Sequence, residues 1–167
     1  MKKIVLITLS ILLALSFWNC EKDDICAEGT PTTPRVIIEF YDAANPTVLK
    51  NVTSLGIIEP TFTTGFGFTA VSKIQVPLRT TVDLTTLNFI QNGSDTDTSN
   101  DNVDILTFNY QRVDEYISRA CGYKTLFYLD ATNPVDLTDD GNNWIQDIIV
   151  TQPNIENENE VHVKIYF

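Results

Sequence analysis

Apolar and polar side chains alternate along much of the chain after residue 34. In RVIIEFYD, which begins at Arg35, the apolar residues Val36, Ile38 and Phe40 occupy every second position. A longer alternation spans GFGFTAVSKIQVPL, residues 65–78, with mostly apolar side chains on one face and threonine, lysine and glutamine on the other. A period of two residues is typical of a β-strand with one buried face. Both stretches therefore predict strands.

The rest of the chain continues this pattern. Further stretches with the composition of strands are VTSLGII, DLTTLNFI, VDILTFNYQ, KTLFYLD, WIQDIIVT and EVHVKIYF. Turn-rich segments separate them, namely DAANP, QNGSDTDTSNDN, ATNPVDLTDDGNN and QPNIENEN. The stretch RVDEYISRAC could form a helix or could equally continue a strand. About eight strands joined by polar turns predict an all-β domain over residues 35–167, a single antiparallel β-sandwich with Greek-key connections.

The N-terminal region has a different pattern. Lys2 and Lys3 precede a largely apolar run from Ile4 to Trp18, which is the layout of a secretory signal peptide. The run is shorter than the roughly 20 residues that cross a bilayer. We therefore expect residues 1–19 to be a cleaved signal peptide, with an uncleaved anchor as the alternative. The polar segment 20–34 is expected to be an extended tether, because it contains Pro31 and Pro34.

The position of Cys20 directly after this run resembles that of bacterial lipoproteins. In that class the cysteine receives a lipid and becomes the mature N-terminus, which implies lipidation of Cys20. The preceding residues Phe17, Trp18 and Asn19 depart from the usual Leu-like residue followed by two small ones. Looser patterns of this kind are typical of lipoproteins of the Bacteroidota. The resemblance implies an outer-membrane lipoprotein, held at the membrane by its N-terminal lipid.

The three cysteines of the chain are Cys20, Cys26 and Cys121. An odd number in an exported protein leaves one thiol to be explained. If Cys20 carries the lipid, an oxidising compartment would allow Cys26 and Cys121 to form a disulfide. Two unpaired cysteines are the alternative.

The charge of the chain limits its partners. Removing residues 1–19 takes away two lysines, so nine basic and 22 acidic residues remain and the net charge falls from −11 to −13. Such an acidic surface disfavours nucleic acid and anionic lipid as partners. Attachment to the membrane would then depend on the lipid.

The charged residues after Cys20 resemble an export signal. In lipoproteins of the Bacteroidota, a lysine and two acidic residues just after the lipidated cysteine direct the protein to the cell surface. Lys22, Asp23 and Asp24 stand at the matching positions. The resemblance implies display on the cell surface. A plain polar spacer, on a protein that faces the periplasm, is the alternative.

Residues that could carry chemistry are few. Asp95, Asp97, Ser99 and Asp101 alternate as in the first half of a calcium loop, but Gly and the final Glu of that loop are replaced by Asn100 and Leu106. We expect a solvated loop without a cofactor, with calcium as the alternative.

Trp144 could contact a ligand, and His162 could serve in a catalytic triad or a zinc site. Trp144 follows a turn and could stack on a sugar, but a core position is favoured for a tryptophan of a β-sandwich. The single histidine, His162, is expected to face solvent from a strand.

Several segments together resemble one family. They are CEKDDIC, TPRVIIEFYD, VPLRTTVDLTTLNF, SRACGY, NWIQDIIV and VHVKIYF. The family is one of small flavobacterial lipoproteins that share a domain of unknown function. The resemblance implies that Cys26 and Cys121 are family features, which suits a disulfide, and it implies no catalytic residues. We expect a non-catalytic binding or envelope-accessory module with a glycan or an envelope protein as partner. A structural envelope protein and a carboxylate- or metal-dependent hydrolase are the alternatives.

Overall fold

A computed structural model describes residues 3–5, 7–8, 10 and 25–167 of the chain. The predicted lipidation site Cys20 and the predicted export signal Lys22, Asp23 and Asp24 lie outside the described residues. The chain divides into two compact units, one made of segments 31–115 and 124–167 and the other of segments 1–30 and 116–123. In the part that the structure describes, no helix has the length and apolar character needed to cross a membrane.

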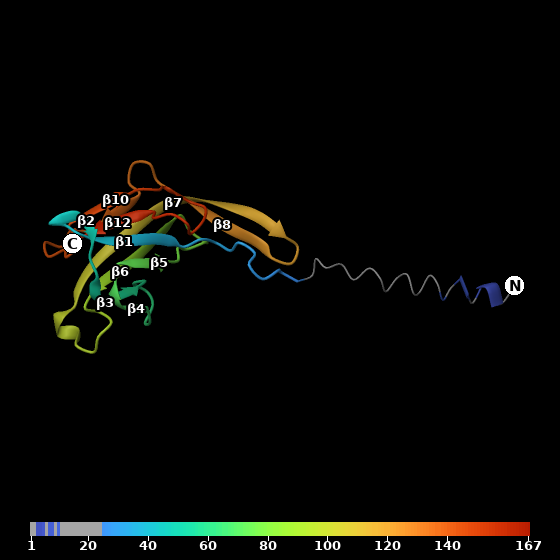
Figure 1. The fold of residues 1–167 in the computed structure, drawn as a ribbon, viewed down its shortest axis with the longest axis horizontal. Helices are drawn as coiled ribbons and strands as arrows, with labels where there is room; N and C mark the ends of the chain where they lie inside the picture. Colours follow the sequence, from blue (N-terminus) through green and yellow to red (C-terminus); the bar gives the residue numbers. More distant parts are fainter. Residues whose placement is uncertain (1–2, 6, 9, 11–24) are drawn as a thin grey trace. The chain divides into compact units, whose positions relative to one another are not determined.

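Two β-sheets, packed on each other, form the larger unit (Figure 1). The five-stranded sheet has the order β10-β12-β1-β2, and β5 pairs with β1 beside β2. Its strands are β1 (Val36–Asp42), β2 (Asn45–Leu49), β5 (Lys73–Val76), β10 (Asp147–Val150) and β12 (Val163–Tyr166). The two packed sheets confirm the predicted β-sandwich.

The seven-stranded sheet has the order β11-β8-β7-β6-β3-β4, with β9 paired to β7. Its strands are β3 (Val52–Ile58), β4 (Phe66–Val71), β6 (Leu84–Gln91), β7 (Asn102–Ser118), β8 (Gly122–Leu129), β9 (Val135–Leu137) and β11 (Asn154–Ile155). A single turn of 3-10 helix, η2 (Thr98–Asn100), precedes β7. The described residues thus contain twelve strands, more than the sequence predicted, because one predicted stretch forms both β4 and β5, and the short strands β2, β9 and β11 were not predicted.

The core follows from the alternation seen in the sequence. Val36, Ile38 and Phe40 of β1 are fully buried and face the side chains of the other sheet, such as Phe89 and Phe108. Burying large aliphatic and aromatic side chains is the dominant favourable term in folding. Phe167, which follows β12, is also buried and packs in the core.

Residues 65–78 do not form one strand. Ala70, near the end of β4, has a positive φ of 53°; β4 ends at Val71 and β5 begins at Lys73. The backbone oxygen of Ser72 then accepts a hydrogen bond from the amide of Phe40, at 2.9 Å. The two halves of the alternation therefore belong to different sheets. The even period continues across the break, which is why the sequence alone suggested a single strand.

Three other local predictions can now be compared with the structure. The ambiguous stretch RVDEYISRAC continues β7 as far as Ser118, so it is a strand. The end of DAANP, expected to be a turn, begins the exposed strand β2. Strands β1 and β12 run parallel, with Ile38 beside Val163, although the prediction was an antiparallel sandwich.

The packed unit begins earlier than Arg35. Pro34 is buried, and the hydroxyl oxygen of Thr33 accepts a hydrogen bond from the amide of Thr125 at 3.0 Å. Arg35 itself is fixed by a two-pronged contact to Glu158 at 2.7 and 2.8 Å. The last residues of the expected tether thus belong to the β domain.

Candidate binding site

An apolar pocket of ≈ 350 Å³ lies where the β3–β4 and β5–β6 connections meet. Its walls are mostly aliphatic and aromatic, and they include Ile57, Phe62, Phe66, Leu78 and Leu87. Pockets that bind small ligands or anchor side chains of a partner are typically apolar with a few polar groups, and this volume is at the lower end of their range. The pocket is therefore large enough for one or two apolar side chains.

Two phenylalanines remain exposed at this pocket. Phe62 is 60% exposed and Phe66 is 55% exposed, although each is large and fully apolar. Their position follows from the sequence EPTFTTGFGF after the end of β3 at Ile58. A turn begins at Pro60, and the amide of Phe62 donates to the Glu59 carbonyl at 2.9 Å. Exposed apolar groups around a concavity are typical of interaction sites.

Gly65 allows the chain to return to the sheet beside this pocket. A Cβ atom at this position would lie 2.2 Å from the backbone oxygen of Ile57 and 2.9 Å from the Cβ of Ile58. Any side chain would therefore push the β3–β4 connection away from β3. The close backbone approach is the reason that a glycine stands here.

A charged pair lies at the rim of the pocket. The guanidinium of Arg79 is 3.6 Å from the carboxylate of Glu59. Glu59 is the more buried partner, with 14% of its side chain exposed, against 43% for Arg79. An ion pair this open to water contributes little to stability, about 0–1 kcal/mol. It does place a donor and an acceptor for a ligand next to an apolar surface.

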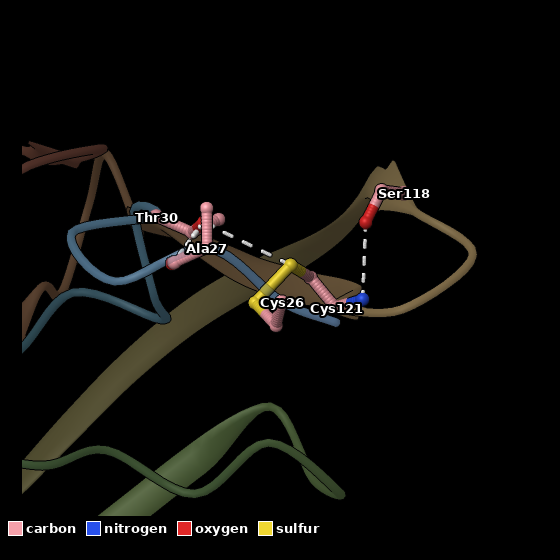
Figure 2. Close-up of a disulfide and its surroundings, with 5 residues drawn as sticks. All are labelled: Cys26, Ala27, Thr30, Ser118 and Cys121. Carbon is pink, nitrogen blue, oxygen red and sulfur yellow. Dashed lines mark hydrogen bonds between the residues drawn. A yellow bond between two sulfur atoms is a disulfide. The ribbon is translucent and has the colours of Figure 1, made fainter. Parts of the chain in front are cut away.

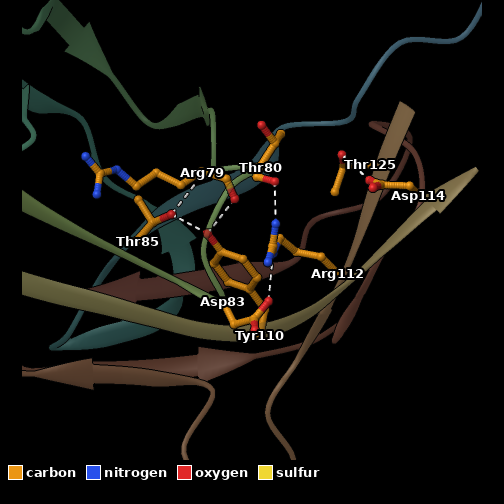
Figure 3. Close-up of polar contacts among 8 residues, drawn as sticks. All are labelled: Arg79, Thr80, Asp83, Thr85, Tyr110, Arg112, Asp114 and Thr125. Atoms are coloured by element: carbon orange, nitrogen blue, oxygen red, sulfur yellow. Dashed lines mark hydrogen bonds and ion pairs between the residues drawn. The ribbon is translucent and has the colours of Figure 1, made fainter. Parts of the chain in front are cut away.

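The β5–β6 connection that carries Arg79 is held by side chains of β7 (Figure 3). The hydroxyl of Tyr110 donates to the Arg79 carbonyl at 2.8 Å and lies 2.6 Å from the hydroxyl of Thr85. Burial raises the pKa of the Tyr110 phenol. The amide of Arg79 in turn donates to Thr85 Oγ1 at 2.8 Å. The backbone at Arg79 is thus fixed from both sides.

Arg112 fixes the other half of the same connection. Its Nε donates to the carboxylate of Asp83 at 2.7 Å, and its guanidinium also bonds to the Thr80 carbonyl (Figure 3). Side-chain hydrogen bonds to charged groups are among the stronger ones in proteins. One wall of the pocket is therefore preorganised by β7.

Strand β4, which starts in the pocket with Phe66, is the last strand of its sheet. It pairs with β3, with Ile57 beside Phe66 and Val52 beside Val71, and has no strand on its outer side among the described residues. Most of its residues are exposed. An open edge of this kind is a template on which another extended chain can pair.

These pocket residues were not selected from the sequence. The alternation of residues 65–78 places Phe66 on the apolar face of a strand, and Phe62, Glu59 and Arg79 belong to none of the patterns that predict a site. The signal that could have found them is local: two phenylalanines in a run of Thr and Gly directly after Pro60. Large apolar residues in a turn-rich segment are often exposed for a reason.

The predicted disulfide between Cys26 and Cys121 is present (Figure 2). The sulfur atoms are 2.04 Å apart, and the bond closes a loop across 95 positions of the sequence. Cys121 lies in the turn between β7 and β8, where its amide donates to Ser118 Oγ at 3.0 Å.

The calcium candidate is a tight loop stabilised by its own side chains. Asp95 Oδ1 accepts the Asp97 amide at 2.8 Å, and Asp97 Oδ1 accepts both the amide and the hydroxyl of Ser99. The two hydrogen bonds from Ser99 lower the pKa of Asp97. Asp101 follows at the end of η2. Within residues 25–167 and the few described before them, no three His, Cys, Asp or Glu side chains are grouped so that they could hold a metal ion.

Trp144 lies in the core and is only 7% exposed. Its indole N–H donates to the Phe89 carbonyl at 3.1 Å, and its ring packs edge-on against Phe167 with centroids 5.4 Å apart. A ring covered in this way cannot serve as a platform for a sugar, which corrects the ligand alternative. The core position favoured from the sequence is the one observed.

His162 is buried as well, with 1% of its surface exposed, so the expectation that it faces solvent was wrong. Its Nδ1 accepts the amide of Ile37 at 2.8 Å, and its own amide donates to the Ile37 carbonyl at 3.0 Å. Burial lowers the pKa of the imidazole, which favours the neutral form. The ring acts as a backbone partner for β1, which a pattern of alternating residues could not reveal.

The fold and the pocket define a two-sheet β protein with an exposed apolar site beside an open sheet edge. Its family is shown by a model described as "Family of unknown function (DUF6452)", which matches residues 61–167. The chain belongs to this family. No curated protein matches the chain, and no solved structure matches it.

Proposed function

We propose that the protein is a lipid-anchored, non-catalytic binding module that takes up an extended segment of a partner protein. The segment would pair with the outer edge of β4 and place an apolar side chain in the pocket between Phe62 and Phe66. The observation that carries this proposal is the meeting of the two features, because Phe66 both begins the open strand and lines the pocket.

Strand addition combines two kinds of contact. Main-chain hydrogen bonds along the edge supply affinity, and pockets for alternate side chains supply specificity. Here the specificity pocket is apolar, and its rim carries Glu59 and Arg79. The best partner segment is therefore extended, with one large apolar side chain and polar or charged neighbours.

Other open edges are less suited to this role. Strand β2 is fully exposed but contains Pro46, and proline on an edge strand prevents regular pairing. Strand β11 has only two residues. Strand β10 exposes Ile149 by 45%, and the hollow beside it is more polar in its lining, with Gln146 and Asp147. The apolar pocket distinguishes β4 from all three.

A glycan is a weaker candidate for the same pocket. Sugar recognition needs several hydrogen-bonding groups around a ring, whereas this pocket is lined mainly by Ile, Leu, Phe and Pro side chains. Trp144, the residue first considered for stacking on a sugar, lies in the core.

Binding is tested with a library of random extended peptides selected against the purified protein. We expect enrichment of peptides with one large apolar residue, and their affinity should fall about tenfold or more in Phe62→Ala and Phe66→Ala, as for anchor residues of an interface. Ile149→Ala is the matched control, because Ile149 is similarly exposed but lies on the other sheet. Equal losses in all three variants, or glycan binding that depends on Phe62, would contradict the proposal.

The anchor and the location belong to the same proposal. We propose that Cys20 carries the lipid and that Lys22, Asp23 and Asp24 direct the protein to the outer face of the outer membrane. The support is the signal-peptide pattern of residues 1–19 and the position of these charges after the cysteine. The Cys26–Cys121 disulfide adds support, because such bonds persist in oxidising compartments outside the cytoplasm.

Mass spectrometry of the mature N-terminus should find an acylated Cys20. Protease added to intact cells should remove the domain while a periplasmic control protein survives. Replacing Lys22, Asp23 and Asp24 with alanine should leave the protein acylated but protected. An unmodified Cys20 in membranes would refute the anchor, and a protected wild-type protein would refute surface display.

A further inference from the structure

The turn between β7 and β8, together with the strand residues on either side of it (residues 116–123), exposes large amphipathic side chains. Tyr116 is 57% exposed and Tyr123 is 68% exposed, and their rings meet edge-on with centroids 5.3 Å apart. Ile25, next to the disulfide, is 83% exposed. Tyrosine rings combine an apolar body with a polar tip, so they are enriched where one end of a residue is dry and the other wet. None of these three side chains lines the pocket described above.

The disulfide links this turn to the N-terminal part of the chain (Figure 2). Cys121 lies inside the turn, and its partner Cys26 follows Cys20 by six positions. Six residues span at most about 20 Å even when fully extended. If Cys20 is acylated, as proposed above, the turn is therefore held within about this distance of the bilayer surface.

The composition of the turn also differs from that of the whole protein. Segment 116–123, YISRACGY, contains Arg119 and no acidic residue, although the chain has 22 acidic residues. A strongly acidic surface is repelled by anionic head groups, whereas segment 116–123 adds no negative charge of its own, although Glu115 precedes it and Asp23 and Asp24 precede Ile25 in the sequence. Tyrosine and tryptophan gather at the level of lipid head groups in membrane proteins.

From these observations we propose that the β7–β8 turn is a membrane-contact surface that rests on lipid head groups through Tyr116, Tyr123 and Ile25. The lipid supplies the anchor, and the turn supplies a second contact that restricts the orientation of the protein. The occupant is a lipid surface rather than a protein, because the covalent link to Cys26 keeps the turn close to the acylated residue. The inference rests on the proposed acylation of Cys20 and is independent of the pocket.

The test uses the mature acylated protein in vesicles of phosphatidylcholine brominated near the head-group end of its acyl chains. Tyr123→Trp introduces a fluorescent reporter into the turn. The wild-type protein is the control, because its mature chain contains only Trp144, which is buried. We expect the brominated lipid to remove roughly half or more of the added emission, since an indole at head-group level lies close to these bromines.

A second variant tests the surface rather than the reporter. Adding Tyr116→Ser and Ile25→Ser to Tyr123→Trp should reduce the quenching, because less apolar surface remains to hold the turn at the interface. These side chains are exposed, so the fold should be retained. Tyr116→Ser and Ile25→Ser in a protein that keeps Tyr123 verify this, because the emission of Trp144 should then equal that of the wild type.

The mass of the same sample shows whether Cys20 is acylated. This measurement distinguishes failure of the lipid anchor from failure of the membrane contact. Acylated Cys20 with emission that bromine quenches supports the contact. Acylated Cys20 with emission that only aqueous acrylamide quenches overturns the contact and leaves the anchor intact. A protein without acyl chains on Cys20 refutes both the anchor and the membrane contact.

Discussion

At the scale of single residues, Asp104 shows how one buried acid shapes the core. It occupies an inward position of β7, between strand residues that are otherwise apolar. Its carboxylate accepts the amides of Trp144 at 3.3 Å and Ile145 at 2.7 Å. Burial raises the pKa of this carboxyl, although the two amide bonds oppose the effect. The acid therefore fixes the segment that carries Trp144.

We predict a graded loss of stability at Asp104. Asp104→Ala leaves two buried amides without a partner and should lower the free energy of unfolding by about 2–5 kcal/mol. Asp104→Asn keeps one acceptor oxygen and should cost less. Urea unfolding monitored by Trp144 fluorescence measures both. If Asp104→Ala and Asp104→Asn lower the free energy of unfolding equally, the bonds to the two amides are not the cause of the loss.

The buried His162 predicts a dependence of stability on pH. Burial lowers its pKa below 6.5 in the folded protein, although Glu158, Glu160 and a bond to the Asn157 backbone oppose this shift. The unfolded chain therefore binds a proton at a higher pH than the folded one. The contribution of His162 to the free energy of unfolding is fully present above pH 6.5. It is lost as the pH falls from 6.5 to the pKa of the folded protein.

Urea midpoints at about pH 8 and about pH 5 test this prediction. Carboxylates such as Glu158, whose pKa Arg35 lowers, also titrate on the acid side. The comparison is therefore with His162→Asn, whose side-chain oxygen can accept the Ile37 amide without titrating. The wild type should lose more stability on acidification than the variant. An equal loss in the two proteins would show that the histidine is not protonated on unfolding.

At the scale of elements, the β5–β6 connection depends on Tyr110. Tyr110→Phe removes the hydroxyl that bonds to the part-buried Arg79 carbonyl and to the buried hydroxyl of Thr85, so both partners lose a bond. We predict a loss of about 1–3 kcal/mol in unfolding free energy and weaker peptide binding, because the wall of the pocket is less fixed.

Tyr128→Phe is the matched control for this change. The hydroxyl of Tyr128 bonds to Glu156 at 2.8 Å in an exposed setting, so its removal should change stability by less than about 0.5 kcal/mol and leave binding unchanged. Thermal unfolding and peptide titration measure the two effects. Equal consequences for both tyrosines would contradict a special role of Tyr110.

The elements also show how far the sequence could predict the fold. Strands such as β1 were predictable, because Val36, Ile38 and Phe40 fall on one buried face. The crossing between sheets at Ser72, between β4 and β5, was not predictable, because an even alternation does not show which sheet a strand joins. The parallel pairing of β1 with β12 was not predictable from the sequence either, because strand pairing depends on contacts between residues far apart in the chain.

The candidate site was less predictable than the fold. The disulfide could be inferred from a count of cysteines, and it is present. The pocket could not, because Phe66 has the same spacing as buried strand residues and only the packing shows that it is exposed. Glu59 and Arg79 are separated by 20 positions, and the fold alone brings them together.

At the scale of the whole molecule, the disulfide closes a long loop. The double variant Cys26→Ser/Cys121→Ser should lower the free energy of unfolding by up to about 4–5 kcal/mol, since cross-linking distant positions restricts the unfolded chain. Chemical denaturation of the variant measures this, and the wild type in reducing agent provides a second estimate. Identical midpoints for the oxidised wild type and the variant would show that the bond does not stabilise the fold.

The central claim is that β4 and the adjacent pocket bind an extended segment of a partner. Amide hydrogen exchange of the protein saturated with a selected peptide tests it most directly. The account predicts slower exchange along β4, Phe66–Val71, together with slower exchange at Phe62, and little effect in Phe62→Ala at the same peptide concentration. Slower exchange confined to the edges β2 or β10, or none on β4, would contradict the account.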